Sequence, residues 1–282
     1  MSYYLNFRAN AVGGPVIDPY LLQGDGTANP PLLRSVDWSA LDAIVSGKNV
    51  LFGVHGFNVS YEQGACSLGR LEPHLGMGPS EVFFGVLWPG DFWIPVINYP
   101  FEGDVAIDCG RRLAIFCRRW LSKAQSISFL SHSLGARLVL EAVENLERKT
   151  RSICLTAAAV NRDCLSTEYA TATANSSAVS ILASHNDLPL RIAFPVADAM
   201  SDVFHYDHSP FQPALGYGGP PSPALPPIIP PWQIPDAADY GHHDYLPPGD
   251  STQNDPESEG QKWLLPAGFM ARAFHGQTQS WP

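Results

Sequence analysis

A serine placed between a short apolar strand and a helix is the residue of this chain best suited to covalent chemistry. Residues 126–142 begin with Ser-Ile-Ser-Phe-Leu, pass through Ser131-His132-Ser133-Leu134-Gly135, and continue as a helix with leucines and a valine on one side. A strand, a tight turn and a helix in this order lift the hydroxyl of Ser133 clear of the sheet. They also direct the amides that open the helix toward the same point. Many serines followed by Leu-Gly only cap a helix, so this segment alone predicts either a nucleophile or a cap.

A nucleophilic serine needs two partners, and the later part of the chain offers both. A serine hydroxyl is a weak nucleophile unless an imidazole accepts its proton, and a buried carboxylate holds that imidazole in the correct tautomer. Asp187 follows a predicted strand over residues 178–183, and the adjacent His242 and His243 lie in a loop further on. An aspartate before a Leu-Pro pair is ordinarily a turn residue. Its position between the serine and the histidines favours the interpretation as the acid, with Asp163 and Asp202 as weaker alternatives.

These residues can meet only if several strands end at one edge of a sheet. Nearly continuous apolar runs at 49–54 and 81–87 are typical of strands covered on both faces of a parallel sheet. His55-Gly56-Phe57-Asn58 directly follows the first run, at the edge where such sheets bind ligands. Strands are predicted at 3–7, 49–54, 81–87, 127–130, 152–158 and 178–183, and helices at 35–46, 104–122, from the turn to about 149, and 263–274. This alternation predicts an α/β fold, with a mostly parallel central sheet and helices on both faces.

Residues 209–236 differ in composition from the rest of the chain. They hold ten of its 26 prolines. Proline fixes φ and lacks an amide donor, so neither sheet nor a long helix is expected there. Ile228, Ile229 and Trp232 make the segment too apolar for an inert linker. We therefore expect a single domain over 1–282, with 209–236 as a proline-rich lid or loop insertion whose apolar side chains cover an acyl pocket.

The overall composition limits the class of protein. Of the 282 residues, 45% are hydrophobic and 16% charged, as in a globular protein. The net charge of −10 argues against sequence-independent binding of nucleic acid. The first ten residues lack the basic start and the apolar run of a signal peptide, and no later stretch is long enough for a transmembrane segment. We therefore expect a cytoplasmic protein.

No metal or organic cofactor is expected from the sequence. The five cysteines, an odd number without C-x-x-C spacing, indicate neither a disulfide framework nor a thiolate metal site, and buried thiols are expected instead. His205, Asp207 and His208 match no defined ligand spacing, so a solvated turn is expected there. The glycines that follow strands lack both G-x-G-x-x-G and G-K-[ST], the patterns of phosphate-binding loops.

These motifs together resemble an α/β-hydrolase. More narrowly, the chain is similar to a poorly characterised family of serine hydrolases, esterase- or lipase-like, with H-G-F-N after one strand, a W-P pair after the next, and A-H-S-M-G at the elbow. Here these read His55-Gly56-Phe57-Asn58, Trp88-Pro89 and Ser131-His132-Ser133-Leu134-Gly135, and the similarity covers roughly residues 48–190. The chain order of serine, acid and histidine is that of the α/β-hydrolase fold. Ser131 and Leu134 depart from the family pattern without threatening its mechanism.

The resemblance implies a role for each residue of the site. Ser133 would be the nucleophile and Asp187 the acid, and the amides of Phe57 and Leu134 would form the oxyanion hole, with Asn58 as the alternate donor. His242 is favoured as the base because G-H-x-D-Y resembles the ending of many such hydrolases, and His243 is the alternative base. The residues expected to line the substrate pocket are Asn58, Trp88, Trp93, Ile228, Ile229 and Trp232.

The predicted function is hydrolysis of carboxylic esters through an acyl-enzyme intermediate, with a small-molecule or lipid-like ester as substrate. Acyl transfer and thioester hydrolysis would use the same triad. A binding protein with the hydrolase fold and an inert site is a further alternative. Such a protein would lack a triad member, and none of the three is missing here. Nothing in the sequence predicts the oligomeric state.

Overall fold

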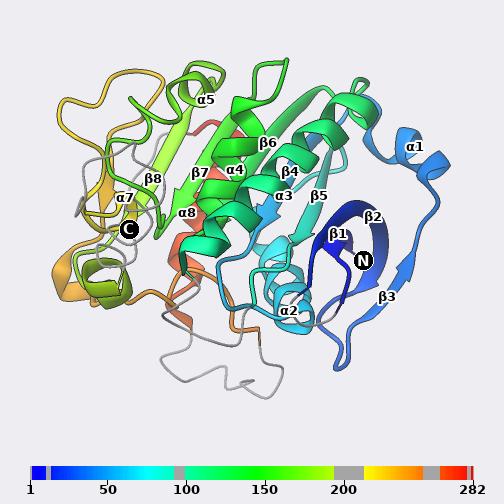
Figure 1. The fold of residues 1–282 in the computed structure, drawn as a ribbon, viewed down its shortest axis with the longest axis horizontal. Coiled ribbons are helices and arrows are strands. Elements are labelled where there is room, and N and C mark those ends of the chain that lie inside the picture. Colours follow the sequence, from blue (N-terminus) through cyan, green and yellow to red (C-terminus); the bar gives the residue numbers. More distant parts are fainter. Residues whose placement is uncertain are drawn as a thin grey trace.

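A nine-stranded sheet forms the centre of the protein (Figure 1). The computed structural model describes residues 2–10, 14–91, 99–193, 213–249, 261–277 and 281. The strand order is β3-β2-β1-β5-β4-β6-β7-β8-β9. The strands are β1 (Ser2–Arg8), β2 (Val16–Asp25), β3 (Leu32–Ser35), β4 (Asn49–Val54), β5 (Glu81–Leu87), β6 (Ser126–His132), β7 (Ser152–Thr156), β8 (Val179–Ala183) and β9 (Trp232–Gln233).

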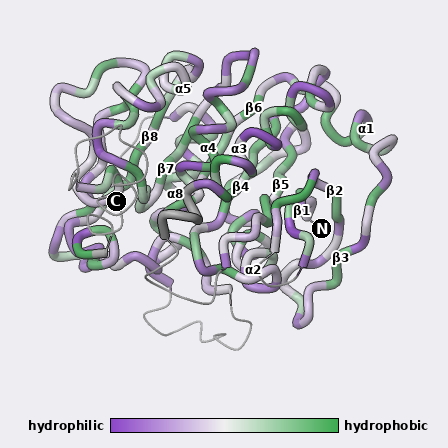
Figure 2. Tube along the Cα trace, in the orientation of Figure 1, coloured by the Kyte–Doolittle hydropathy of each residue, from purple (hydrophilic) through white to green (hydrophobic). Residues whose placement is uncertain are grey.

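The seven strands that follow one another in the sheet as β1-β5-β4-β6-β7-β8-β9 are parallel, as predicted. β4 pairs with β5 and β6, and β7 pairs with β6 and β8, all in parallel register. Every residue of β7 and β8 is buried, and only the first residue of β4, β5 and β6 is not. Continuous apolar runs were expected to give this burial, and Figure 2 shows the same strands as the hydrophobic interior of the molecule.

Helices cover both faces of the sheet. The helices are α1 (Leu41–Val45), α2 (Tyr61–Leu71), α3 (Tyr99–Trp120), α4 (Gly135–Glu144), α5 (Ala170–Ala174), α7 (Leu215–Gly218) and α8 (Leu264–His275), with short helical turns η1 (Trp38–Ala40), η2 (Glu72–Leu75), η3 (Pro189–Ala193) and η4 (Asp236–Ala238). α3 and α4 pack on each other in front of the sheet in Figure 1, and α8 lies behind it against β7 and η2. The long helix α3 begins five residues before its predicted start at 104. The predicted helix 35–46 is present only as η1 and α1.

Two strands near the amino terminus were not predicted. β2 pairs antiparallel with β1 and with β3, and it widens the sheet beyond the parallel strands. Pro19 lies within β2, which hid this strand from a search for apolar runs. The register of β1 and β2 shifts between Asn6 and Arg8, and Pro19 falls in that irregularity, where the missing amide donor does not interrupt a regular ladder.

Part of the proline-rich segment adds the last strand to the sheet, which corrects the expectation that no sheet forms there. The amide of Val179 donates to the carbonyl of Pro227, that of Ile229 to Val179, and that of Ile234 to Ala183. Residues 227–234 therefore run along the whole outer side of β8, and β9 is the part with regular pairing. An edge strand tolerates proline because one of its sides needs no partner.

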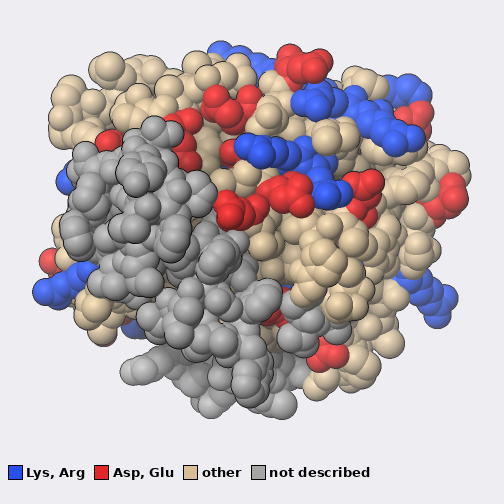
Figure 3. Space-filling view, in the orientation of Figure 1, with Lys and Arg blue, Asp and Glu red and all other residues tan. Residues whose placement is uncertain are grey.

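On the face that carries α3 and α4, basic and acidic side chains are interspersed (Figure 3). Arg111 of α3 pairs with Glu141 of α4 at 2.8 Å, and Arg112 pairs with Asp18 of β2 at 2.6 Å. These ion pairs join neighbouring elements across the surface. None of the helices in the described ranges combines the length and the apolar character needed to cross a membrane.

Candidate active site

Ser133 occupies a strained turn between β6 and α4. Its φ is +54°, a left-handed value that costs a residue other than glycine roughly 1–2 kcal/mol. Main-chain hydrogen bonds hold this conformation, because the amide of Ser133 donates to Thr156 and its carbonyl accepts from Ala136 and Ala159. The side chain is thereby turned off the end of β6, as the strand, turn and helix pattern predicted.

Small residues around the turn are a steric requirement. A Cβ atom added to Gly135 would lie 2.5 Å from the carbonyl oxygen of His55, and one added to Gly56 would lie 3.0 Å from Cβ of Ser133. Real Cβ atoms essentially never come within 2.5 Å of another heavy atom, and 3.0 Å is tighter than nearly all of their contacts. The two glycines therefore allow the turn at Ser133 and the loop after β4 to touch.

Three side chains from distant parts of the chain form one hydrogen-bonded series. Nε2 of His242 lies 2.8 Å from Oγ of Ser133, and Nδ1 of His242 lies 2.8 Å from Oδ2 of Asp187. A carboxylate only accepts, so in the neutral form of the ring Nδ1 would carry the proton and Nε2 would accept from the serine hydroxyl. Asp187 is fully buried, and its other oxygen accepts from the amide of Leu190 at 3.0 Å. The geometry is that of an imidazole oriented by a carboxylate and directed at a serine.

His243, the alternative base, does not take part in this series. Its ring lies edge-on to that of His242, with 5.6 Å between the centroids. Partial burial lowers the pKa of His243 below its ordinary value, and the neighbouring His242 lowers it further. The structure therefore brings His242, and not His243, to Ser133 and Asp187.

The loop that follows β4 lies against the turn at Ser133. Phe57, the first predicted oxyanion donor, lines the cavity beside that turn, and Leu134, the second, directly precedes α4. The amide of Asn58, the alternate donor, is already bonded to the carbonyl of Gly90, although the residue itself lines the cavity. Asn58 also has a positive φ of 57°. The bond to Gly90 counts against the amide of Asn58 as the alternate donor.

Trp88 lies in the core and not in a pocket wall, which corrects its prediction. Its indole is fully buried, stacks on the ring of His55 and donates through Nε1 to the carbonyl of His55 at 2.9 Å. The same His55 is buried, and burial lowers its pKa to about 3, so the ring is neutral. Nδ1 of His55 lies 2.8 Å from the carbonyl oxygen of Gly56, which shapes the loop after β4. Trp93 lies outside the described residues.

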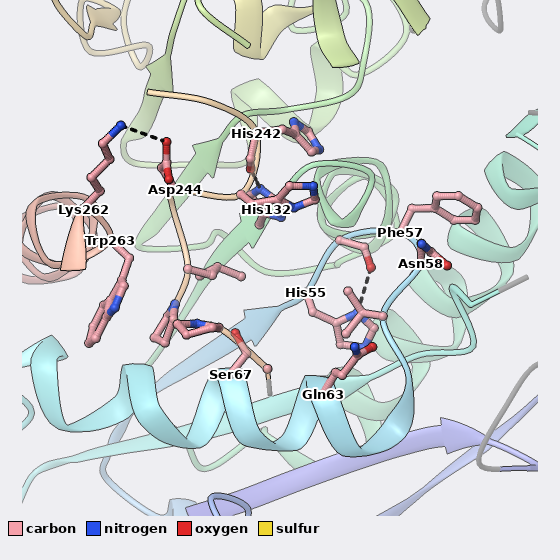
Figure 4. A pocket seen from close by; sticks show the side chains of 17 residues that line it. His55, Phe57, Asn58, Gln63, Ser67, His132, His242, Asp244, Lys262 and Trp263 are labelled. Carbon is pink, nitrogen blue, oxygen red and sulfur yellow. Dashed lines mark hydrogen bonds and ion pairs between the residues drawn. The ribbon is translucent and has the colours of Figure 1, made fainter. Parts of the chain in front are cut away.

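A cavity of about 600 Å³ opens beside these groups (Figure 4). This volume is within the range of small-molecule sites. Gln63 and Ser67 of α2 form one side, and Lys262 and Trp263, just before α8, form the far end. The lining residues are His55, Gly56, Phe57, Asn58, Val59, Gln63, Ser67, His132, His242, His243, Asp244, Leu246, Pro247, Pro248, Gly249, Lys262 and Trp263.

The sequence matches a family described as alpha/beta hydrolase of unknown function (DUF900) over residues 40–204, which is more than half of the chain. The chain belongs to this family. The match includes Ser133 and Asp187, and His242 follows it. The α/β-hydrolase fold inferred from the motifs is thus confirmed, together with the mostly parallel sheet and the helices on both of its faces.

Solved structures that resemble this α/β-hydrolase include two enzymes. One is carboxyl esterase 2 (TmelEST2) from the mycorrhizal fungus Tuber melanosporum, with 13% identity, a TM-score of 0.41, and coverage of 98% of this chain and 89% of that one. The other is a prolyl endopeptidase, with 15% identity, a TM-score of 0.41, and coverage of 98% of this chain but only 39% of that one. No curated protein matches the sequence.

Ile228, Ile229 and Trp232, predicted to cover the acyl pocket of the hydrolase, are not among the residues that line the cavity. They lie in the segment bonded along β8, and Ile228 is level with Val179, the first residue of that strand. Trp232 pairs with Leu182, nearer the carboxyl end of β8. Because none of the three residues lines the cavity, the structure contradicts the prediction that they cover it.

Sequence reasoning missed several residues around the site. Arg8 is buried at the end of β1 and donates to the carbonyls of Val59 and Trp88, and its guanidinium also pairs with Asp91. It thereby ties the loop after β4 to the loop after β5. An arginine at the end of an otherwise largely apolar strand is the signal that could have identified Arg8. Gln63, Ser67, Lys262 and Trp263 carried no comparable signal.

All five cysteines are buried free thiols, as expected. Within the described ranges, no three His, Cys, Asp or Glu side chains are grouped as metal ligands. His205, Asp207 and His208 lie outside those ranges.

Proposed function

We propose that this hydrolase cleaves carboxylic esters through a covalent acyl-enzyme. The observation that carries the proposal is the hydrogen-bonded series of Ser133, His242 and Asp187, with 2.8 Å at each step. A buried carboxylate, an imidazole and a serine hydroxyl in this order are what activation of a serine requires. No chemical step of the proposal needs a metal or an organic cofactor.

In the first half of the reaction, Oγ of Ser133 attacks the acyl carbonyl while Nε2 of His242 takes the hydroxyl proton. Asp187 stabilises the imidazolium that forms. We propose that the amides of Phe57 and Leu134 hold the oxyanion, at the contact between the loop after β4 and the start of α4. His242 then gives its proton to the leaving alcohol. In the second half, water repeats the sequence on the acyl-enzyme and releases the carboxylic acid.

The cavity supports a small-molecule substrate. Its volume of about 600 Å³ would enclose a compact ester, and its wall mixes apolar side chains such as Leu246 and Trp263 with polar ones such as Gln63 and Lys262. Sites of this kind bury most of a ligand and orient it with a few polar groups. We therefore expect turnover of esters with short acyl groups.

The test is steady-state hydrolysis of p-nitrophenyl acetate, butyrate and octanoate by the full chain and its variants. Ser133→Ala and His242→Ala should each lower kcat/KM by roughly 10³-fold or more, because the attacking group or its base is lost. Two neighbours serve as matched controls. Ser131→Ala removes a buried hydroxyl that has no hydrogen-bond partner in the described structure, and His243→Ala removes the imidazole outside the series; both should retain turnover within about tenfold.

Full turnover by Ser133→Ala, or loss of turnover with His243→Ala and not with His242→Ala, would contradict the assignment of roles. Analysis of the product in the presence of added alcohol separates hydrolysis from acyl transfer. A thioester and a p-nitroanilide of the same acyl group show whether the leaving group is restricted to alcohols.

A further inference from the structure

The loop that carries His242 has almost no regular secondary structure of its own. This segment, residues 239–245, is called the base loop below. It follows η4 and consists of turns and irregular chain, and part of it lines the cavity. Side chains from outside the base loop donate to three of its carbonyls. Nζ of Lys262 reaches Asp239, Oγ of Ser184 reaches Tyr240, and Nε2 of His132 reaches His242, each at 2.7 Å. Tertiary hydrogen bonds, rather than a helix or strand, determine where the imidazole lies.

The bond from His132 differs from the other two because its donor directly precedes Ser133. His132 and Ser133, adjacent at the end of β6, thus both bind His242. Ser133 binds Nε2 of the His242 ring, and His132 binds the His242 carbonyl. A shift of the base loop away from β6 would stretch both bonds together. The bonds from Lys262 and Ser184 act on other residues of the base loop.

The chemical state of His132 agrees with a donor role. A carbonyl only accepts, so Nε2 of His132 must carry a proton. Burial lowers the pKa of His132 well below its ordinary value, and the nearby His242 lowers it further, so the ring is neutral. Its centroid lies 4.9 Å from that of His242 and 6.0 Å from that of Tyr245. A neutral ring at this distance places no positive charge beside an imidazolium formed at His242.

We propose that His132 is a positioning residue: through its bond to the main chain of His242, it keeps the base loop at the distance from the elbow at which Nε2 of His242 meets Oγ of Ser133. The inference rests on the proposed function, in which this pair transfers a proton. His132 itself takes no proton from the substrate. Its effect is on geometry, and displacement of a catalytic group by about 1 Å can lower the rate by roughly 10²-fold.

The test compares His132→Phe, which keeps a ring without the N–H, with His132→Gln, whose amide N–H reaches about as far as Nε2. His132→Phe should lower kcat for p-nitrophenyl acetate roughly 10- to 100-fold while KM changes by less than about threefold. His132→Gln should recover most of that loss. If His132→Phe does not fold, His132→Met takes its place, since its side chain also fills the volume without an N–H.

Ser184→Ala is the matched control. It removes a 2.7 Å bond to the carbonyl of Tyr240 in the same loop, together with the bond that Oγ of Ser184 accepts from the amide of Asn186 at 3.1 Å, and Ser184 makes no bond to His242. It should lower kcat by less than about fivefold. Equal loss of kcat in Ser184→Ala and His132→Phe, or no recovery in a folded His132→Gln, would overturn the proposal.

Labelling of Ser133 by a fluorophosphonate is the second readout, because it requires an activated serine but no ester turnover. The labelling rate should fall in the same order, with wild type fastest, then His132→Gln, then His132→Phe. If wild type is labelled rapidly but hydrolyses no ester, the proposed substrate class fails while the role of His132 is still tested. Labelling rates that do not change across the three proteins would overturn the role of His132.

Discussion

Ser133 and His242 lie within hydrogen-bond distance, yet they come from two regions that are built in different ways. The region around Ser133 consists of the ends of β4 and β6 and the start of α4, where backbone packs against backbone and glycines give the space. The region around His242 is the base loop, where the position of the main chain depends on donors from other elements. The first region should therefore be sensitive to added volume, and the second to lost polar contacts.

The clearest way to test this comparison is to add one methyl group to each region. In Gly135→Ala the new Cβ would lie 2.5 Å from a backbone oxygen that cannot move aside, so we expect a loss of about 2 kcal/mol or more in the free energy of unfolding. In Gly241→Ala of the base loop the nearest atom would be Oδ2 of Asp244 at 3.6 Å, an ordinary contact. This variant should stay within about 0.5 kcal/mol of wild type. Urea unfolding measures both, and equal destabilisation would remove the distinction.

The second prediction concerns the pH dependence of stability near the elbow. His55 and His132 are buried and their pKa values are lowered, that of His55 to about 3. Below about pH 6.5 the unfolded chain binds protons that the folded chain excludes, so the free energy of unfolding should fall as pH falls. Well below pH 6.5, each such histidine contributes a slope of about 1.4 kcal/mol per pH unit.

Urea unfolding between pH 7.5 and pH 5.5 measures this slope in a window above the titration of most carboxylates. His132→Gln removes one of the groups that contribute to the slope, so its slope should be shallower than that of wild type. Stability that rises toward pH 5.5 would show that these rings are not held neutral in the folded protein.

The smallest expected effect is on substrate selectivity, and it distinguishes two tryptophans in the carboxyl-terminal part of the chain. Trp263 lines the far end of the cavity, whereas Trp232 lies in β9 on the outer side of β8. Trp263→Ala should change the ratio of kcat/KM values for octanoate and acetate esters by roughly three- to tenfold, because the wall of the site is altered. Trp232→Ala should leave that ratio unchanged. A changed ratio in Trp232→Ala alone would restore the idea of a lid.

Much of the elbow region could be predicted because its signals are local. The apolar runs of β4 and β5, the turn at Ser133 and the glycine after Leu134 each identify a structure within a few residues of chain. The aromatic and proline-rich segments were harder to interpret. Trp88 is as apolar as a pocket wall would be, but its bond to the carbonyl of His55 places it in the core. Ile228 and Trp232 suggested a cover for the site, but pairing with β8 carries them along the edge of the sheet.

By itself, the sequence determined the parallel sheet, the edge at which its polar residues gather, and Ser133 as the residue at the turn, because periodicity, small residues and strand order act over short distances along the chain. The sequence favoured His242 over the adjacent His243 and predicted Asp187 as the acid, but only the tertiary structure brought these side chains to Ser133 and showed that His132 and Arg8 support the surrounding loops. The physical reason is that these are contacts between groups up to about a hundred residues apart, and no local pattern records which of two neighbouring side chains a distant partner will reach.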